Sequence, residues 1–175
     1  ARAAGLEPSL QALRKAGDFA ERSDNYPAAL RFGERALEQA RAGDDQIALA
    51  RVLNDYALTL NSAGRYDEAE PLYREAMAIV EKTLGKEHPS YAASLNNLAG
   101  FHKATGRYDR AEPLFRDAMA ITGATLGKEH PSYAGSLNNL ALLLDPTGRS
   151  DEAEPLFREA MAITGATLGK EHPTY

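Results

Sequence analysis

The chain has 175 residues, of which 43% are hydrophobic and 7% aromatic, and it carries a formal net charge of −5. This composition indicates a globular domain, and the absence of a basic face excludes a general nucleic-acid binder, because such a protein must neutralise many phosphates. No apolar run approaches the roughly 18 residues that span a bilayer, so we expect a soluble protein that binds no nucleic acid and no membrane. A chain without cysteine has neither disulfides nor thiolate-bound zinc, but this does not identify a compartment. Our expectation for the location is the cytoplasm.

Apolar residues recur at helical spacing along almost the whole chain. In the third predicted helix, Leu49, Val52 and Leu53 begin a stripe that continues through Tyr56 and Leu60, which is the pattern of a helix that buries one side. Glycines and short polar turns separate these stripes. The predicted helices are Pro8–Arg22, Pro27–Arg41, Asp45–Ser62, Asp67–Thr83, Pro89–Ala104, Asp109–Thr125, Pro131–Leu144 and Asp151–Thr167.

The predicted helices begin with recognisable start signals. Asp67 and Glu70 have the D-x-x-E spacing of a capping box. His88 precedes Pro89, which predicts a helix with proline at its first position and a histidine that caps the turn. The further copies of the acidic pair are Asp109 with Glu112 and Asp151 with Glu154.

One stretch of sequence occurs three times. It reads GRYDEAEPLYREA from Gly64, GRYDRAEPLFRDA from Gly106 and GRSDEAEPLFREA from Gly148, so that the copies begin 42 residues apart. Helix pairs at such a period predict stacked helical hairpins, none of which can bury its apolar face alone. We expect a single array over residues 1–175, with approximate repeats 8–43, 44–86, 87–128 and 129–171 and with 172–175 as the start of a truncated further repeat.

Small and aromatic residues recur at fixed places in these hairpins. The first helix of each pair, helix A, has a small residue near its middle (Gly17, Ala57, Ala99, Ala141), and the second, helix B, has an aromatic one (Tyr73, Phe115, Phe157). This pattern resembles the tetratricopeptide repeat, and the long period with its LNNLA and LGKEHPSYA wording resembles the subclass found in kinesin light chains. The resemblance implies an all-α fold, a right-handed α-solenoid of antiparallel helical hairpins with about eight helices.

Two parts of the chain depart from this family pattern. In the first hairpin, Gly33 stands where the aromatic residue is expected, and Gly17 replaces alanine. In the last hairpin, Ser150 replaces the tyrosine of the turn, and Asp145–Pro146 interrupts the end of helix A. We expect the fold to tolerate these changes and the local order to be reduced near Asp145–Ser150.

No group of residues predicts catalysis, a cofactor or a bound metal. The string TGATLGKE from Thr122 looks like a phosphate-binding loop, but Glu129 stands where Ser or Thr must ligate the metal, so we interpret it as a helix end. The recurring histidines lie one repeat apart, too far to converge on one ion, and the recurring methionines are expected in the core. These residues are His88, His130 and His172, and Met77, Met119 and Met161.

The polar sides of the A helices are the remaining candidates for binding. In a superhelix of hairpins these sides line the concave surface. Asparagine recurs on them although it is a mediocre helix former, and its side chain offers both the acceptor and the donor that an extended peptide backbone requires. The predicted peptide-binding residues are Arg14, Lys15, Arg51, Asn54, Asp55, Leu58, Asn61, Asn96, Asn97, Lys103, Asn138 and Asn139.

The asparagines also have a purely structural interpretation. They could bond only to one another and to the neighbouring helix, or be inherited with a duplicated repeat. The resemblance favours peptide contact, since repeats of this wording in kinesin light chains bind short cargo peptides in their groove. The clamp by which other tetratricopeptide domains hold chaperone tails is not expected, because the matching positions lack the required cations.

Two functions therefore remain, and neither requires an enzyme or a cofactor. The first is a non-catalytic protein–protein interaction scaffold that binds an extended peptide or partner segment in the concave groove, with acidic ligand side chains near the cations of the first A helices. The second is an assembly or spacer module that forms a homo-oligomer through its C-terminal end, because the last full hairpin leaves an apolar stripe without a following helix. This stripe comprises Leu156, Phe157, Ala160 and Ile163.

Overall fold

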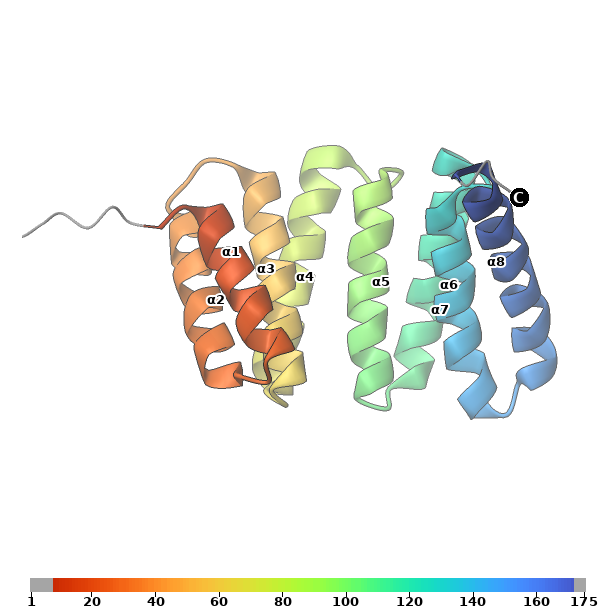
Figure 1. The fold of residues 1–175 in the computed structure, drawn as a ribbon, viewed down its shortest axis with the longest axis horizontal. Coiled ribbons are helices and arrows are strands. Elements are labelled where there is room, and N and C mark those ends of the chain that lie inside the picture. The colour runs from red at the N-terminus through yellow and green to blue at the C-terminus, as the bar shows by residue number, and fades with distance from the viewer. Residues whose placement is uncertain (1–7, 172–175) are drawn as a thin grey trace, which may run out of the picture. The chain divides into compact units, whose positions relative to one another are not determined.

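The computed structural model describes the backbone of residues 8–171 and the side chains of residues 8–166, and within this part it contains eight α-helices, one short 3-10 helix and no strands (Figure 1). Two compact units divide the chain, 1–79 and 80–175, and each is described by itself. The helices are α1 (Leu10–Arg22), α2 (Tyr26–Arg41), α3 (Gln46–Ser62), α4 (Tyr66–Leu84), α5 (Pro89–Ala104), α6 (Tyr108–Leu126), α7 (Pro131–Leu144), η1 (Asp145–Thr147) and α8 (Ser150–Glu171).

The predicted all-α fold of helical hairpins is confirmed. In unit 1, α1 packs against α2 and α2 against α3, and in unit 2 the helices α5 to α8 each pack against the next. The bounds of the described helices differ from the prediction by a few residues. The largest difference is at α8, which continues to Glu171 beyond the predicted Thr167.

Histidines cap two of the A helices, as predicted. His88 accepts a hydrogen bond at Nδ1 from the backbone N–H of Ser90 at 3.1 Å, and His130 does the same with Ser132 at 3.1 Å. Each histidine is followed by proline at the first helical position, where the missing N–H costs nothing. The third histidine of the series, His172, lies outside the described residues.

The predicted capping box of α6 is wrong. Arg107 occupies the cap position without a side-chain bond, and the helix starts at Tyr108, so Asp109 lies inside the first turn. Glu112 accepts a hydrogen bond at 2.8 Å from Nη2 of Arg116, one turn further along. In the D-x-x-E sequence, the aspartate therefore interacts favourably with the dipole at the start of the helix, and the glutamate forms an i,i+4 ion pair. In α4 and α8, likewise, Asp67 and Asp151 lie in the first turn, and Glu70 pairs with Arg74 and Glu154 with Arg158.

In unit 1, the glycine that departs from the family pattern is covered by a tyrosine. A Cβ atom built on Gly33 of α2 would lie 2.3 Å from Cδ2 of Tyr56 on α3, so the ring rests directly on the glycine backbone. The Oη of Tyr56 donates a hydrogen bond to Oε1 of Glu34 at 3.2 Å. Tyr56 thus fills the space that an aromatic residue of helix B would otherwise fill.

Two hydrophobic clusters of unit 2 lie between helices of its described part. In the first, Phe115 of α6 is buried with Leu140 and Leu144 of α7. In the second, Tyr133 of α7 is buried with Ile163 of α8. These clusters join the last two hairpins into one core.

The core prediction for the methionines holds only in part. Met119 packs against both clusters of unit 2, and Met77 is half-buried. Met161 is 74% exposed, so its predicted core position is wrong.

The prediction of an open apolar stripe on α8 is also partly wrong, because Ala160 and Ile163 are buried against α7. The large apolar residue that the described part of α8 leaves exposed is therefore Met161, one position after the predicted Ala160.

The interruption at the end of α7 forms a defined turn. Residues Asp145–Thr147 make a 3-10 helix, the hydroxyl of Ser150 donates to Oδ1 of Asp145 at 2.7 Å, and the N–H of Arg149 donates to the carbonyl oxygen of Leu144 at 3.1 Å. The interruption thus has its own set of hydrogen bonds, and the reduced local order near Asp145–Ser150 stays a prediction.

Other sequence expectations concern ligands and location. The TGATLGKE string spans the end of α6, with Gly127 just beyond its last residue, as predicted for a helix end. No three potential metal ligands come together among the described residues. None of the described helices combines the length and apolar composition needed to cross a bilayer. The cytoplasmic location and the single-array organisation stay predictions.

Candidate binding faces of the A helices

Two of the predicted charges in unit 1 pair with each other. Arg14 on α1 donates from Nε to Oδ2 of Asp55 on α3 at 2.6 Å, and the two side chains keep 37% and 43% of their surface exposed. Burial raises the pKa of the Asp55 carboxyl, and the Arg14 guanidinium acts against this shift. The pair links two neighbouring A helices and still presents one charge of each sign to the solvent.

A small pocket opens beside this ion pair. It is lined by Arg14, Asp18 and Asp55 together with the rings of Phe32 and Tyr56. Its cavity volume of about 20 Å³ has room for a single water molecule and for no ligand side chain. This pocket therefore cannot serve as a specificity pocket for a ligand side chain.

On α3, two asparagines flank an exposed leucine. Asn54 donates from Nδ2 to the carbonyl oxygen of Ala50 at 3.1 Å, whereas Oδ1 of Asn54 and Oδ1 of Asn61 are buried without a hydrogen-bond partner. Leu58, one turn after Asn54, is 52% exposed. A buried acceptor without a partner costs about 1–3 kcal/mol, and because both oxygens are buried, Leu58 is the part of this face that a ligand can reach.

In unit 2, two asparagines from neighbouring A helices meet. Asn139 on α7 donates from Nδ2 to Oδ1 of Asn96 on α5 at 3.5 Å, and both residues are half-buried. This contact is at the long end for a hydrogen bond, and for this pair it supports the structural interpretation. Asn97 and Asn138 are exposed and remain accessible to a ligand.

The exposed leucine of α3 recurs on α7. Leu142 is 43% exposed and follows Asn138 by one turn, as Leu58 follows Asn54. At the same position α5 has Gly100, where an added Cβ would meet no atom within 4 Å. The predicted set of binding residues does not include Leu142. The repeat period could have identified it, because Leu142 lies 84 residues, or two periods, after the predicted Leu58.

The other predicted residues place mixed charge on these faces. Lys15 and Arg51 are exposed, and Lys103 is half-buried on the last turn of α5. Arg51 is close enough to lower the pKa of the Asp55 carboxyl, and Asp18 is close enough to raise it. The cations expected to receive acidic ligand side chains therefore stand among carboxylates, which weakens any selection for an acidic ligand in unit 1.

Comparison with known families and proteins gives one consistent result. The family model of the tetratricopeptide repeat matches residues 9–82, 48–122 and 91–166, so the overlapping matches run from 9 to 166. A curated relative, the RxLR effector protein SFI4 of Phytophthora infestans (strain T30-4), is 37% identical over 57 residues, which are 33% of this chain and 17% of the effector. The chain thus resembles a small part of that protein.

Similar solved structures cover nearly the whole chain. A Podosopora anserina kinesin light chain protein with nearly identical TPR-like repeats is 30% identical, with a TM-score of 0.77 and coverage of 94% of this chain and 79% of that one. A single-substitution variant of that protein has the same identity and TM-score and is covered to 78%. BtubC (BKLC) from P. vanneervenii is 19% identical, with a TM-score of 0.65 and coverage of 95% and 83%, which shows a shared fold alone.

Proposed function

The chain belongs to the tetratricopeptide repeat family, and on this premise we propose that it is a non-catalytic protein–protein interaction scaffold whose A-helix faces bind an extended segment of a partner. One observation carries the proposal. In each unit an A helix exposes a leucine one turn after an asparagine, Leu58 after Asn54 and Leu142 after Asn138. A leucine gains free energy when a ligand covers it, and the amide beside it can bond to a ligand backbone.

The chemistry of these faces suits an extended segment. An extended backbone presents N–H and C=O groups that cannot pair with a helix, because the helix uses its own backbone groups internally. Asparagine side chains supply a donor and an acceptor at such a surface. In unit 1, the carbonyl oxygens of Asn54 and Asn61 have no other partner. These two oxygens are buried, so we expect the ligand to place an apolar side chain on the exposed Leu58 and to bond to asparagines that are exposed, such as Asn97 and Asn138.

A displayed peptide library tests this proposal. Peptides selected on the whole chain are labelled, and their affinity is measured by fluorescence anisotropy for Leu58→Ala, Leu142→Ala and the control Leu126→Ala. Leu126, at the end of α6, is 37% exposed and therefore matches Leu142 at 43%. We expect a loss of about tenfold for at least one of the A-helix variants, equivalent to about 1.4 kcal/mol, and no change for the control.

Two results would contradict the proposal. One is a selection that yields no peptide binder. The other is a set of binders whose affinity is the same for Leu58→Ala, Leu142→Ala and the wild type. Circular dichroism of each variant checks that the helices are intact, which is expected because all three leucines are substantially exposed.

A second candidate function is end-to-end assembly through α8. It is favoured by the exposed side chain of Met161 and the half-buried ring of Phe157 on the outer side of this helix. Contact with a second copy of the chain would remove this apolar surface from water. Light scattering over a range of protein concentrations tests it, and a strictly monomeric chain at every concentration would remove self-assembly as the function.

A further inference from the structure

The A helices of the two units begin with chemically different caps. In unit 1, the hydroxyl of Ser9 accepts a hydrogen bond from a backbone N–H of α1 at 3.3 Å, and Oδ1 of Asp45 accepts one from α3 at 2.9 Å. In unit 2, the acceptors at the same place are imidazole nitrogens, Nδ1 of His88 for α5 and Nδ1 of His130 for α7. Unit 1 therefore caps its A helices with oxygen, and unit 2 caps them with nitrogen.

An imidazole nitrogen accepts a hydrogen bond only while it carries no proton. Nδ1 of each histidine accepts at 3.1 Å from the N–H of the serine two residues later, so both rings are neutral with their proton on Nε2. Protonation places an N–H group on Nδ1, facing the N–H of the serine, and adds a positive charge at the positive end of the helix dipole. The protonated ring thus loses the bond and is repelled by the helix start.

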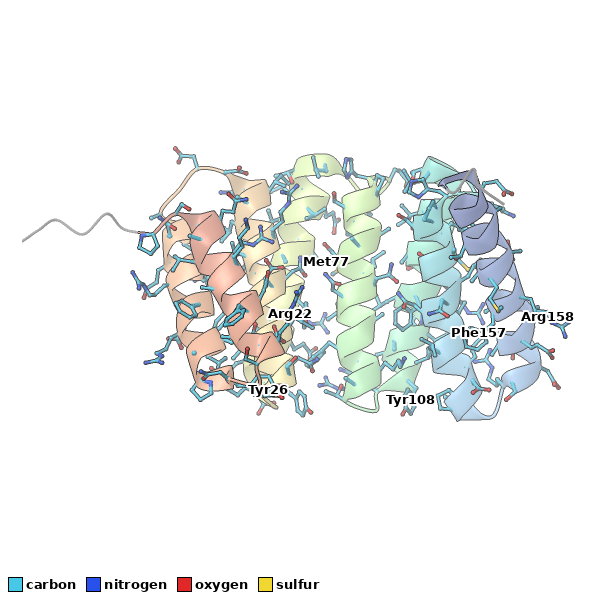
Figure 2. All side chains as sticks on the ribbon, in the orientation of Figure 1. Arg22, Tyr26, Met77, Tyr108, Phe157 and Arg158 are labelled. Atoms are coloured by element: carbon cyan, nitrogen blue, oxygen red, sulfur yellow. The ribbon has the colours of Figure 1, made fainter. Side chains whose placement is uncertain are left out.

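The two histidines share one position and one kind of surroundings. Both are exposed, and both begin helices at the same end of unit 2, opposite Tyr108 at the start of α6 (Figure 2). Each follows a lysine and a glutamate in the chain, so that charges of both signs stand beside it. These neighbours are Lys86 and Glu87 for His88, and Lys128 and Glu129 for His130.

The elements packed against these helix starts carry further charges. On α4, Glu81 pairs with Lys86 at 3.3 Å, and Lys82 lies in the last turn. The last turn of α6, with the sequence ITGATL, has no charged residue. Burial raises the pKa of Tyr133 in the first turn of α7, and Glu159 of α8 adds to this shift. With charges of both signs nearby, the contact with the backbone N–H is what most directly distinguishes the neutral from the protonated histidine.

We propose that these caps are an acid-sensitive device: protonation of His88 and His130 releases the first turns of α5 and α7, while the A helices of unit 1 keep their caps. Because the bond requires the neutral ring, its contribution to stability is complete above about pH 6.5, where free imidazole titrates, and is lost as the pH falls below it. Hydroxyls and carboxylates titrate outside the interval from pH 5.5 to pH 7.5, so the oxygen caps of unit 1 hold there.

Acid would then act on one binding face before the other. Helices α5 and α7 carry Asn97, Asn138 and Leu142, whereas Leu58 lies on α3. Under the function proposed above, mild acid weakens ligand contact in unit 2 and spares unit 1. This consequence rests on that function, but the acid sensitivity of the caps does not, so its test uses no ligand.

The amide signals of the wild-type chain test the caps directly. A titration from pH 7.5 to pH 5.5 is followed by NMR at the N–H groups of Ser90 and Ser132, which donate to the histidines. We expect both amide protons to move upfield, as the loss of a hydrogen bond requires. The internal controls are the N–H groups of Ala12 and Ala48, which donate to the oxygen caps of unit 1 and should stay in place.

The double variant His88→Asn/His130→Asn provides the second test. Asparagine is among the best capping residues and takes up no proton in this range. We expect the variant to match the wild type in urea unfolding at pH 7.5. At pH 5.5, the folding equilibrium constant of the wild type should have fallen about tenfold more than that of the variant, with roughly threefold from each cap.

His102→Leu is the control for the third described histidine. His102 is 2% exposed on α5, at the position where α3 has Leu60 and α7 has Leu144, both 1% exposed. Placing a charge on a buried ring costs free energy, so this residue makes its own contribution to acid sensitivity. In a His102→Leu background, we expect the amide movements and the advantage of the two asparagine substitutions to persist.

Either of two results would overturn the proposal. One is a pair of amide signals, from Ser90 and Ser132, that stay constant between pH 7.5 and pH 5.5. The other is a His88→Asn/His130→Asn variant that loses as much stability in acid as the wild type. A library selection that yields no peptide binder would remove the proposed function and leave both of these measurements unaffected.

Discussion

The contact between α2 and α3 in unit 1 and the contact between α6 and α7 in unit 2 fill equivalent space in two ways. In unit 2, helix B supplies the large Phe115 and helix A supplies Leu140. In unit 1, helix B has Gly33 at that position, and helix A has Tyr56, 84 residues or two periods before Leu140. The large ring has changed helices. The comparison teaches that such an interface needs a certain total side-chain volume, and that either of the two helices can supply the large side chain.

The exchange also changes the polar edge of the interface. A tyrosine brings a hydroxyl that needs a partner when buried, and Glu34 accepts its hydrogen bond at 3.2 Å. At the equivalent position α6 has Arg116, which pairs with Glu112 on its own helix at 2.8 Å. Tyr56 and Glu34 therefore form a matched pair, and the sign of the charge at this position is reversed between the two units.

The strongest test transplants the residue of unit 2 into unit 1. Gly33→Phe forces a ring into space that the Tyr56 ring occupies, since even an added Cβ would lie 2.3 Å from Cδ2 of that ring. We expect a loss of about 3 kcal/mol in the free energy of unfolding. Adding Tyr56→Leu should restore about 2 kcal/mol of this loss, as measured by urea unfolding of both single variants and the double variant.

The two single variants and the double variant together test whether the residues at positions 33 and 56 depend on each other for packing. A double variant that is as unstable as the sum of the two single variants would show that Gly33 and Tyr56 are not coupled. The volume exchange would then be an incorrect description of the first interface.

A smaller effect separates two helical glycines that look alike in sequence. Gly33→Ala introduces a methyl group against the Tyr56 ring, and we expect a loss of about 1 kcal/mol because the ring must shift. Gly100→Ala meets no atom within 4 Å and should gain about 0.5–1 kcal/mol from helix propensity. Opposite signs in urea unfolding are the expected result, and a gain at both positions would contradict the close packing at Gly33.

The smallest effect concerns the hydroxyl of Tyr56. Tyr56→Phe removes the bond to Glu34 and should cost about 0.5–1 kcal/mol at neutral pH. Burial, with Glu34 beside it, raises the pKa of Tyr56 from 10.0 to about 12. Because the folded-state pKa is raised, the neutral tyrosine stabilises the fold fully below pH 10, and this contribution is lost as the pH rises towards 12.

The expected signature is a pH-dependent difference between the variant and the wild type. Unfolding is measured by urea at pH 7 and at pH 11, and the stability deficit of Tyr56→Phe should shrink or reverse at the higher pH. A deficit that is the same at both pH values would show that the pKa of Tyr56 is not raised in the folded chain.

Most of the fold follows from the sequence because it depends on local periodicity. Helix bounds, the histidine caps of α5 and α7 and the helix end after Thr122 all depend on residues a few positions apart. The capping box at Asp109 was mispredicted since an acid in the first turn and an i,i+4 ion pair have the same spacing in sequence. Local patterns fix where helices occur and leave some of their side-chain bonds undecided.

The remaining errors depend on neighbours that lie far away in sequence. The role of Tyr56 requires knowing that it faces Gly33 on another helix. Met161 was placed in the core by analogy with Met119, but burial of the latter depends on α7 lying against it. For the candidate binding faces, sequence located the asparagines, but the internal bond from Asn54 to Ala50 is a matter of side-chain rotamer. Periodicity cannot determine such choices.

The repeated residues of α6 and α8 also have a consequence for how the gene can change. Phe115, Met119, Thr122 and Gly123 reappear unchanged as Phe157, Met161, Thr164 and Gly165. A duplication or deletion of one 42-residue coding unit between them would leave the newly adjoining helices with residues that already fit. Recombination within this part of the gene can therefore lengthen or shorten the protein in whole hairpins, without further mutations to adapt the junction.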